Sequence, residues 1–333
     1  MMFFTGGGLA LFAWRAGALR QGGIFAPISR EGSLVLNNVL LSVACATVLV
    51  GTLYPLALEG ITGEKISVGP PFFNMTFIPL MLPLLFAMPF GPLLAWKRGD
   101  VRAVAQRLGF VAGLAVLFTV IVAVMSGPGP WLAPICVALG LFVLLGAITD
   151  LFTRARFGDV SSDEFRRGTA LAHAGIGIMV LGIVGTSAYQ TEKIVALKPG
   201  EKAEVAGYEL LFKGIQPTKG PNYSEQIATF EVARNGAPVT TLLPSKRLYN
   251  APPQPTTEAG IYAAWTGDLY IALGDEQPSG AVAMRLYFHP FVRLIWLGSV
   301  IMFIGGMISL SDRRLRVGAP QRARARASAV PAE

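Results

Sequence analysis

The segment Gly168–Tyr189, with the sequence GTALAHAGIGIMVLGIVGTSAY, decides the fold class of this chain. It is an apolar run long enough to cross a bilayer as a helix. His173 is the only side chain inside it that titrates near neutral pH. An ionisable residue at membrane depth is costly and usually faces the bundle interior or a functional site. The segment therefore predicts a membrane protein in which His173 is the first candidate functional residue.

Similar apolar runs recur along the 333 residues, which are 53% hydrophobic and only 14% charged. Soluble domains carry about 25% charged residues. The runs predict a polytopic α-helical bundle of six to seven spans. We expect full spans at residues 35–58, 72–96, 107–125, 131–152, 168–189 and 289–312, and a shortened first span at 2–14.

Basic residues fall in alternate loops and at the C-terminal end, whereas the loops 59–71 and 126–130 carry only Lys65. The basic set is Arg15, Arg20, Arg30, Lys97, Arg98, Arg102, Arg107, Arg154, Arg156, Arg166, Arg167 and the six arginines from Arg313 to Arg326. By the positive-inside rule these loops are cytoplasmic, and residues 313–333 form a disordered basic tail there. The net charge of +8 therefore reflects membrane topology, and nucleic acid is excluded as a partner because no basic, aromatic-interleaved soluble face is present.

Residues 190–288 interrupt the apolar pattern and are expected to form a periplasmic all-β domain inserted before the last span. Residues 228–242 alternate in polarity around Asn235-Gly236, which predicts a hairpin with a type I′ turn. Residues 268–274 and 281–288 indicate a second strand pair. The proline-rich residues 251–255 are expected to be a loop. Such a domain is a small barrel or sandwich.

The two cysteines, Cys45 and Cys136, lie inside expected spans and form no CxxC motif. This placement favours small apolar packing residues over thiol redox chemistry.

His173 has two interpretations. It lies about 7–8 Å beyond Gly168 along the helix, at a rise of 1.5 Å per residue. Glycines follow it at positions 175, 177, 182 and 185 and make the helix thin, which permits close helix packing or the approach of a flat macrocycle. The imidazole either forms a helix–helix hydrogen bond or ligates a metal such as haem iron. A six-coordinate haem would need its second ligand from another chain or from sequence outside this one.

Other candidate residues lie in or beside the β domain. Lys246, Arg247 and Arg285 are possible contacts for an acidic partner or for haem propionates, although such charges are also typical of a solvated face. His289 lies at the membrane entry of the last span, where we expect a local interfacial role.

An ordered set of motifs resembles the C-terminal half of the CcmF family, the haem lyase subunits of the bacterial cytochrome c maturation system. The motifs are Asn37-Asn38, Gly51-Thr-Leu-Tyr-Pro-Leu, Val68-Gly-Pro-Pro-Phe-Phe-Asn, Ala172-His-Ala-Gly, Gly220-Pro-Asn-Tyr, Pro244-Ser-Lys-Arg-Leu-Tyr, Asp268-Leu-Tyr-Ile-Ala-Leu-Gly and Ser311-Asp-Arg-Arg. Each motif is weak alone, but their order and spacing match over nearly the whole chain.

The resemblance implies an inner-membrane component that attaches haem to the CxxCH cysteines of apocytochrome c in the periplasm. It implies a membrane haem b with His173 as an axial ligand, and so a metal site through the haem iron. The implied partners are the haem chaperone CcmE, CcmH, CcmI and apocytochrome c. A rival of a different class is a non-catalytic membrane scaffold whose β domain only docks such partners.

The family's Trp-rich periplasmic segment, its two flanking histidines and its other membrane histidine have no counterpart in this sequence. We therefore expect a truncated or split form that requires an N-terminal CcmF-like half for activity, and no catalytic residue is assigned.

Overall fold

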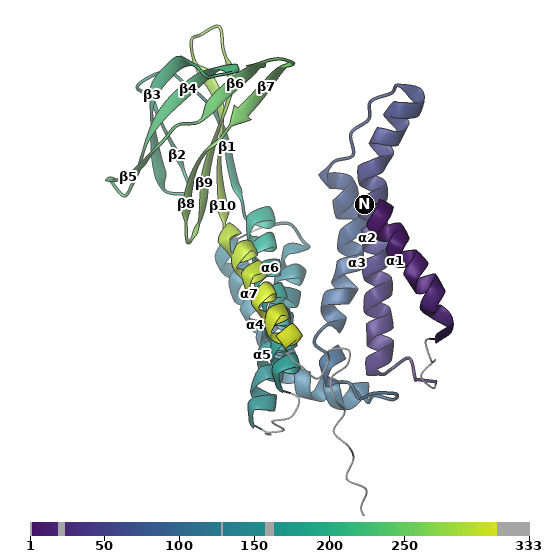
Figure 1. Cartoon of the computed structure of the whole chain (residues 1–333). Helices are drawn as coiled ribbons and strands as arrows, with labels where there is room; N and C mark the ends of the chain where they lie inside the picture. Colours follow the sequence, from purple (N-terminus) through teal and green to yellow (C-terminus); the bar gives the residue numbers. More distant parts are fainter. Residues whose placement is uncertain (1, 19–23, 128, 157–162, 312–333) are drawn as a thin grey trace, which may run out of the picture. The chain divides into compact units, whose positions relative to one another are not determined.

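The computed structural model describes residues 2–18, 24–127, 129–156 and 163–311, so Arg20 and the expected tail 313–333 lie outside the described residues. Among the described residues, six helices are long and apolar enough to cross a membrane: Arg30–Thr62, Pro70–Leu93, Val101–Met125, Ala133–Phe152, Arg167–Ala188 and Val292–Ser311. A β domain precedes the last of them (Figure 1). The predicted class, a polytopic helical membrane protein with an inserted β domain, is confirmed.

The helices, in chain order, are α1 (Met2–Arg15), α2 (Arg30–Thr62), α3 (Pro70–Ala87), α4 (Val101–Ser126), α5 (Ala133–Arg156), α6 (Asp163–Ala188) and α7 (Val292–Ser311), with 3₁₀ turns at Ala16–Ala18 and Gly91–Leu93. Capping sets the ends of α2 beyond its apolar run. The Ser29 hydroxyl accepts a hydrogen bond from the Gly32 N–H at 3.0 Å, and Gly63 closes the other end at a φ of 75°. The start of α3 at Pro70 is set by proline, which is well suited to a first helical turn.

The chain forms two compact units, residues 1–107 and 108–333. The second unit holds α5, α6, α7 and the β domain, and therefore both histidines.

The β domain consists of two antiparallel sheets. The first has the strand order β1-β10-β9-β8, and the second has the order β2-β3-β4-β6-β7 with β5 paired to β4. The strands are β1 (Thr191–Leu197), β2 (Lys202–Val205), β3 (Tyr208–Lys219), β4 (Tyr223–Arg234), β5 (Ala237–Leu242), β6 (Ser245–Asn250), β7 (Pro253–Glu258), β8 (Gly260–Ala264), β9 (Gly267–Glu276) and β10 (Val282–Pro290).

Alternate residues of both sheets meet in one apolar core. Leu269 and Ile271 of β9 face Phe212 and Phe230 of the second sheet, and all four are fully buried. The Phe212 and Phe230 rings stack with their centroids 5.1 Å apart. Alternation along each strand therefore separates a buried inner face from an outer face, as the sequence pattern predicts.

Both predicted strand pairs are confirmed. β4 and β5 form the expected hairpin, and Asn235 and Gly236 have φ values of 51° and 77°, both positive as a type I′ turn requires. β9 and β10 form the second pair. The loop predicted at residues 251–255 is wrong in part, because Pro253 and Pro255 belong to β7. This strand lies at the edge of its sheet, where proline's missing N–H costs no ladder hydrogen bond.

The membrane helices α6 and α7 lie in backbone contact along a row of glycines. A Cβ atom on Gly175 would lie 2.6 Å from the Gly298 carbonyl oxygen and 2.8 Å from the Met302 nitrogen. A Cβ atom on Gly305 would lie 2.6 Å from the Gly168 carbonyl oxygen. The thin face predicted from the glycines is thus used for close helix packing.

This helix pair continues directly into a strand pair. α6 ends at Ala188 and β1 begins at Thr191, while β10 ends at Pro290 and α7 begins at Val292. β1 and β10 are hydrogen-bonded neighbours in register Thr191↔Phe288. The α6–α7 contact therefore fixes where the first sheet of the sandwich starts.

We predict that Gly175→Val destabilises the α6–α7 pair by about 1–3 kcal/mol or more, because the new side chain has to displace backbone atoms of α7. The matched control is Gly306→Val, since a Cβ atom there meets nothing within 4 Å. Thermal unfolding of the detergent-solubilised chain measures both. An equal effect of the two variants would contradict the packing argument.

Candidate functional site

His173 lies on the side of α6 that faces α5. On the same side, a Cβ atom on Gly177 would lie 2.7 Å from the Leu144 nitrogen of α5, and one on Gly140 would lie 3.1 Å from side-chain atoms of Val180 and Leu181. Residues 170, 173, 177, 180 and 184 share this face at helical spacing. The face towards α7 is separate, because it carries Gly168, Gly175 and Gly182.

The His173 imidazole is half-buried, and no residue in the described part of the chain forms a hydrogen bond with it. The first interpretation from the sequence, a helix–helix hydrogen bond, is therefore not what the described residues show. Ile183 and Ser187 are exposed ten and fourteen residues further along α6. A half-buried imidazole without a hydrogen-bond partner among the described residues is available to a ligand from outside α5 and α6.

Asp150 of α5 is the charged neighbour of this imidazole. Its side chain is only 7% exposed, and it interacts electrostatically with His173. The helix register agrees, because Leu144 lies against Gly177 and the two antiparallel helices then bring Asp150 level with residues 170–173. The sequence analysis missed Asp150, although a carboxylate inside the apolar run 131–152 is a signal of the same kind as His173.

His289 cannot serve the same centre as His173. It lies on β10, whose next residue, Pro290, contacts Gly185 near the far end of α6. Gly185 is twelve residues from His173 along α6, a separation of roughly 18 Å at 1.5 Å per residue. His289 instead stacks on Tyr287 with ring centroids 5.6 Å apart.

Arg247 of β6 is held inside the β domain. Its Nε donates to Glu225 Oε2 at 2.8 Å, its Nη1 lies 3.3 Å from Glu258 Oε1, and its guanidinium lies 4.7 Å from the centre of the Tyr223 ring. The Ser245 hydroxyl also donates to Glu225 Oε2, at 3.0 Å. The hydrogen bond from Arg247 lowers the pKa of the Glu225 carboxyl from its usual value, and the same bond raises the pKa of Arg247.

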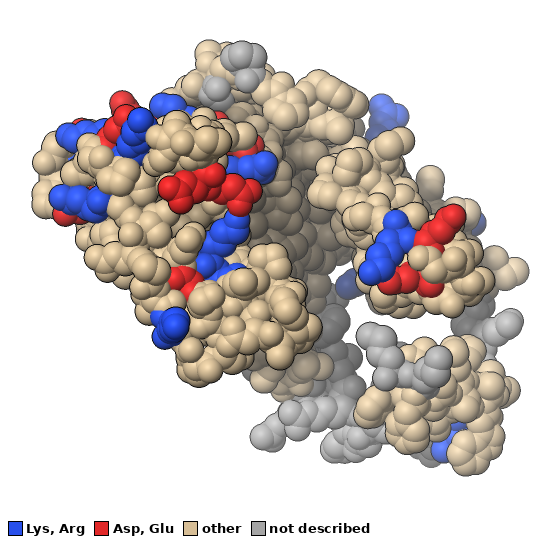
Figure 2. Space-filling model, turned by 90° about the horizontal axis from the view of Figure 1, so that it is seen from above, with Lys and Arg blue, Asp and Glu red and all other residues tan. Residues whose placement is uncertain are grey.

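Lys246 and Arg285 also have partners within the domain. Lys246 pairs with Asp275, which lowers the pKa of that carboxyl. Arg285 lies 4.0 Å from Glu192, and its Nη1 donates to the Tyr287 hydroxyl at 3.5 Å. The three basic residues selected from the sequence therefore do not converge on one site. Figure 2 shows the same mixture, with Lys and Arg interspersed among Asp and Glu on the visible face of the β domain.

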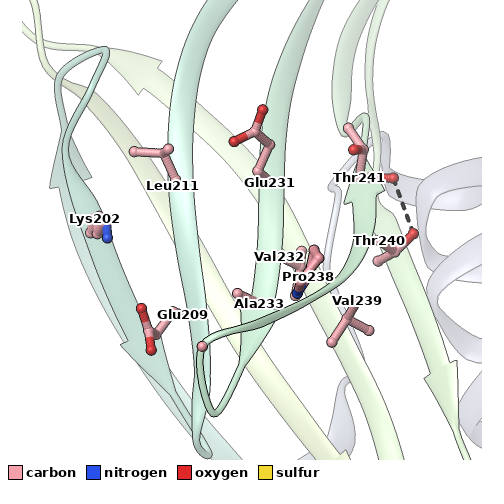
Figure 3. Close-up of a pocket in the computed structure, with 11 residues that line it drawn as sticks. Lys202, Glu209, Leu211, Glu231, Val232, Ala233, Pro238, Val239, Thr240 and Thr241 are labelled. Carbon is pink, nitrogen blue, oxygen red and sulfur yellow. Dashed lines mark hydrogen bonds between the residues drawn. The ribbon is translucent and has the colours of Figure 1, made fainter.

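The β domain also carries an open cavity of about 500 Å³ on the outer side of β2–β5 (Figure 3). Lys202, Glu209 and Glu231 are among its lining residues, with Thr240 and Thr241 on the β5 side. It contains none of the residues selected from the sequence. In the described part of the chain, no group of three or more His, Cys, Asp or Glu residues could hold a metal ion.

Fold and site together define a polytopic membrane protein with a β sandwich before its last span and one unpartnered histidine on a membrane helix. Residues 188–290 match a family model described as the CcmF C-terminal beta-sandwich. The chain is 51% identical to the cytochrome c-type biogenesis protein CycK of Rhizobium meliloti, over 97% of this chain and 49% of that protein. It is 36% identical to CcmF of Escherichia coli, over 95% of this chain and 49% of that protein.

Among solved structures, "Cytochrome c Heme Lyase CcmF" matches 93% of this chain and 49% of that chain, with a TM-score of 0.68 and 25% identity. The chain is therefore CcmF-like, and it is a multi-pass inner-membrane protein. It spans about half the length of the curated relatives it matches.

We predict that Glu225→Gln lowers the thermal stability of the β domain, because Arg247 and Ser245 lose their charged acceptor. The folded pKa of Glu225 is lowered, so its stabilisation is present above the unfolded value of about 4.3 and is lost as the pH falls through the folded value. The loss of thermal stability in Glu225→Gln is thus largest at pH 7 and becomes smaller as the pH falls.

Loss of β-sheet circular dichroism on heating the detergent-solubilised chain measures this deficit. The matched control is Glu231→Gln on the same strand, whose carboxylate is exposed and pairs only with the exposed Lys213 at 3.1 Å. A Glu225→Gln deficit that is independent of pH would contradict the assignment.

Proposed function

We propose that this chain acts as part of a cytochrome c haem lyase and that His173 is an axial ligand of a membrane haem b. The observation that carries the proposal is the unpartnered imidazole on α6, in a chain whose relatives are named for cytochrome c-type biogenesis. The donor chemistry fits, because a neutral imidazole is a common haem ligand and the α5–α6 seam beside it borders an exposed face.

The group, when bound, supplies a one-electron redox couple within the membrane. His173 would hold the group through its imidazole, and the close packing of α6 on α5 and α7 would fix the depth of this residue in the bundle. Any second protein ligand would have to come from outside the described residues, because His289 is too distant from His173. The reaction proposed for the complex is addition of each CxxCH thiol S–H across one vinyl C=C bond of the substrate haem, and the role proposed for this chain is to hold the membrane haem through His173.

The β domain, on the periplasmic side in this proposal, docks the haem chaperone CcmE and the apocytochrome presented with CcmH and CcmI. Its support is the mixed-charge outer surface of a rigid sandwich at the end of α6 and α7. In this proposal the chain acts together with the part of a CcmF-like protein that the comparison does not cover, since it spans about half the length of the relatives it matches. The competing assignment, a scaffold without haem, makes the opposite prediction for His173.

We predict that His173→Gly, purified together with an N-terminal CcmF-like half, loses its b-type haem spectrum and recovers it when imidazole is added. Free imidazole fits the space that the side chain leaves and can replace the missing ligand. The control is His289→Gly, which is expected to keep the spectrum. An unchanged spectrum in the His173 variant favours the scaffold.

We also predict that Asp150→Asn raises the midpoint potential of the bound haem while leaving its spectrum in place. Asparagine removes the carboxyl group that can carry a negative charge beside the ligand, and a unit charge roughly 10 Å away at an effective dielectric constant of about 20 contributes roughly 1–2 kcal/mol to stabilising the ferric state. Redox titration measures the shift, and Asp150→Glu, which keeps the charge, is the control. A potential that does not change would exclude this electrostatic role.

A further inference from the structure

The turn between β8 and β9 is attached to the first residues of the last membrane span. The Phe291 N–H donates to the Thr266 carbonyl at 3.2 Å, and Arg293 Nη2 donates to the Ala263 carbonyl at 2.8 Å. The Arg293 guanidinium also lies 5.5 Å from the centre of the Trp265 ring. In Figure 1 this turn lies at the end of the sandwich nearest the helices, beside the start of α7.

Arg293 belongs to the outward side of α7. Trp296, Val300, Ile304 and Met307 follow it at helical spacing and are 44–72% exposed. The opposite side of the helix carries Gly298 and Gly305, which pack on α6. The β8–β9 turn therefore lies at the N-terminal end of the side of α7 that faces away from α6.

Two large apolar side chains are exposed at the junction between the β8–β9 turn and α7. Trp265 is 78% exposed and Phe291 is 51% exposed, and α7 begins at the residue that follows Phe291. An indole at the end of an apolar span is typical of the membrane–water interface, where its ring is shielded from water while its N–H stays hydrated.

The charge of Arg293 is compensated at the same place. Arg293 Nε lies 3.8 Å from Asp268 Oδ1, and both atoms are buried with no hydrogen bond. Burial raises the pKa of Asp268, and the Arg293 guanidinium nearby acts in the opposite direction. Because Asp268 compensates the charge of Arg293, this arginine is poorly suited to bind a free anion. The exposed rings of Trp265 and Phe291 are therefore the groups available for binding at this surface.

We propose that the β8–β9 turn is a lipid-binding surface: Trp265 and Phe291 insert at the boundary between headgroups and acyl chains beside α7. Arg293 ties the turn to the span, so the insertion fixes the tilt of the sandwich against the bilayer. The partner is the phospholipid interface itself, and this surface is independent of the haem site.

The test is a nitroxide spin label at Trp265→Cys, in the full chain with Cys45 and Cys136 replaced by alanine and reconstituted in phosphatidylcholine vesicles. Collisional accessibility to oxygen and to a water-soluble nickel chelate reports depth. The control label is at Ser279→Cys, an exposed position in the β9–β10 turn, one length of β9, roughly 30 Å, from the β8–β9 turn.

We expect the oxygen-to-nickel accessibility ratio at position 265 to exceed that at position 279 several-fold. Equal ratios would overturn the proposal, and so would protection of position 265 from both reagents, which indicates a protein contact. A label at Thr266→Cys, which keeps Trp265, repeats the measurement if the first variant does not fold, with the same outcomes.

Discussion

The glycine-mediated contact between α6 and α7 is the constraint on which the rest of the second unit depends. It brings two backbones together so closely that a single methyl group at Gly175 would overlap the Gly298 carbonyl. The same two segments leave the helices side by side and become the neighbouring strands β1 and β10. The packing of α6 on α7 thus sets the position of the sandwich, and His173 lies on the other side of α6, which faces α5.

Polar groups in and beside the membrane spans have two different kinds of environment. Arg293 and Asp268, at the end of the span, compensate each other and join α7 to the β domain. His173 and Asp150 lie deeper, where the imidazole has no hydrogen-bond partner among the described residues. In the β domain, by contrast, Arg247, Lys246 and Arg285 each lie beside a carboxylate of the same domain, so we assign them a structural role. The site that remains open to an outside ligand is the membrane histidine.

Much of this architecture could be predicted from the sequence, because hydrophobic runs, alternating strands and the Asn235-Gly236 turn are local signals. Helix ends were less predictable, since Ser29 and Pro70 act through capping and not through hydrophobicity. Pro253 and Pro255 were misassigned because only the sheet order shows that β7 is an edge. The partners of Arg247 and the attachment of Trp265 to Arg293 depend on residues far apart in sequence, so no local pattern could reveal them.

The proposed function depends above all on this chain supplying one ligand of a membrane haem. The most direct measurement is the haem content, by pyridine-haemochrome and reduced-minus-oxidised spectra, of the unmodified chain purified alone and together with an N-terminal CcmF-like half. We expect a b-type haem when both parts are present, in an amount proportional to the amount of purified complex. Absence of haem from both preparations would contradict it and leave the chain as a scaffold.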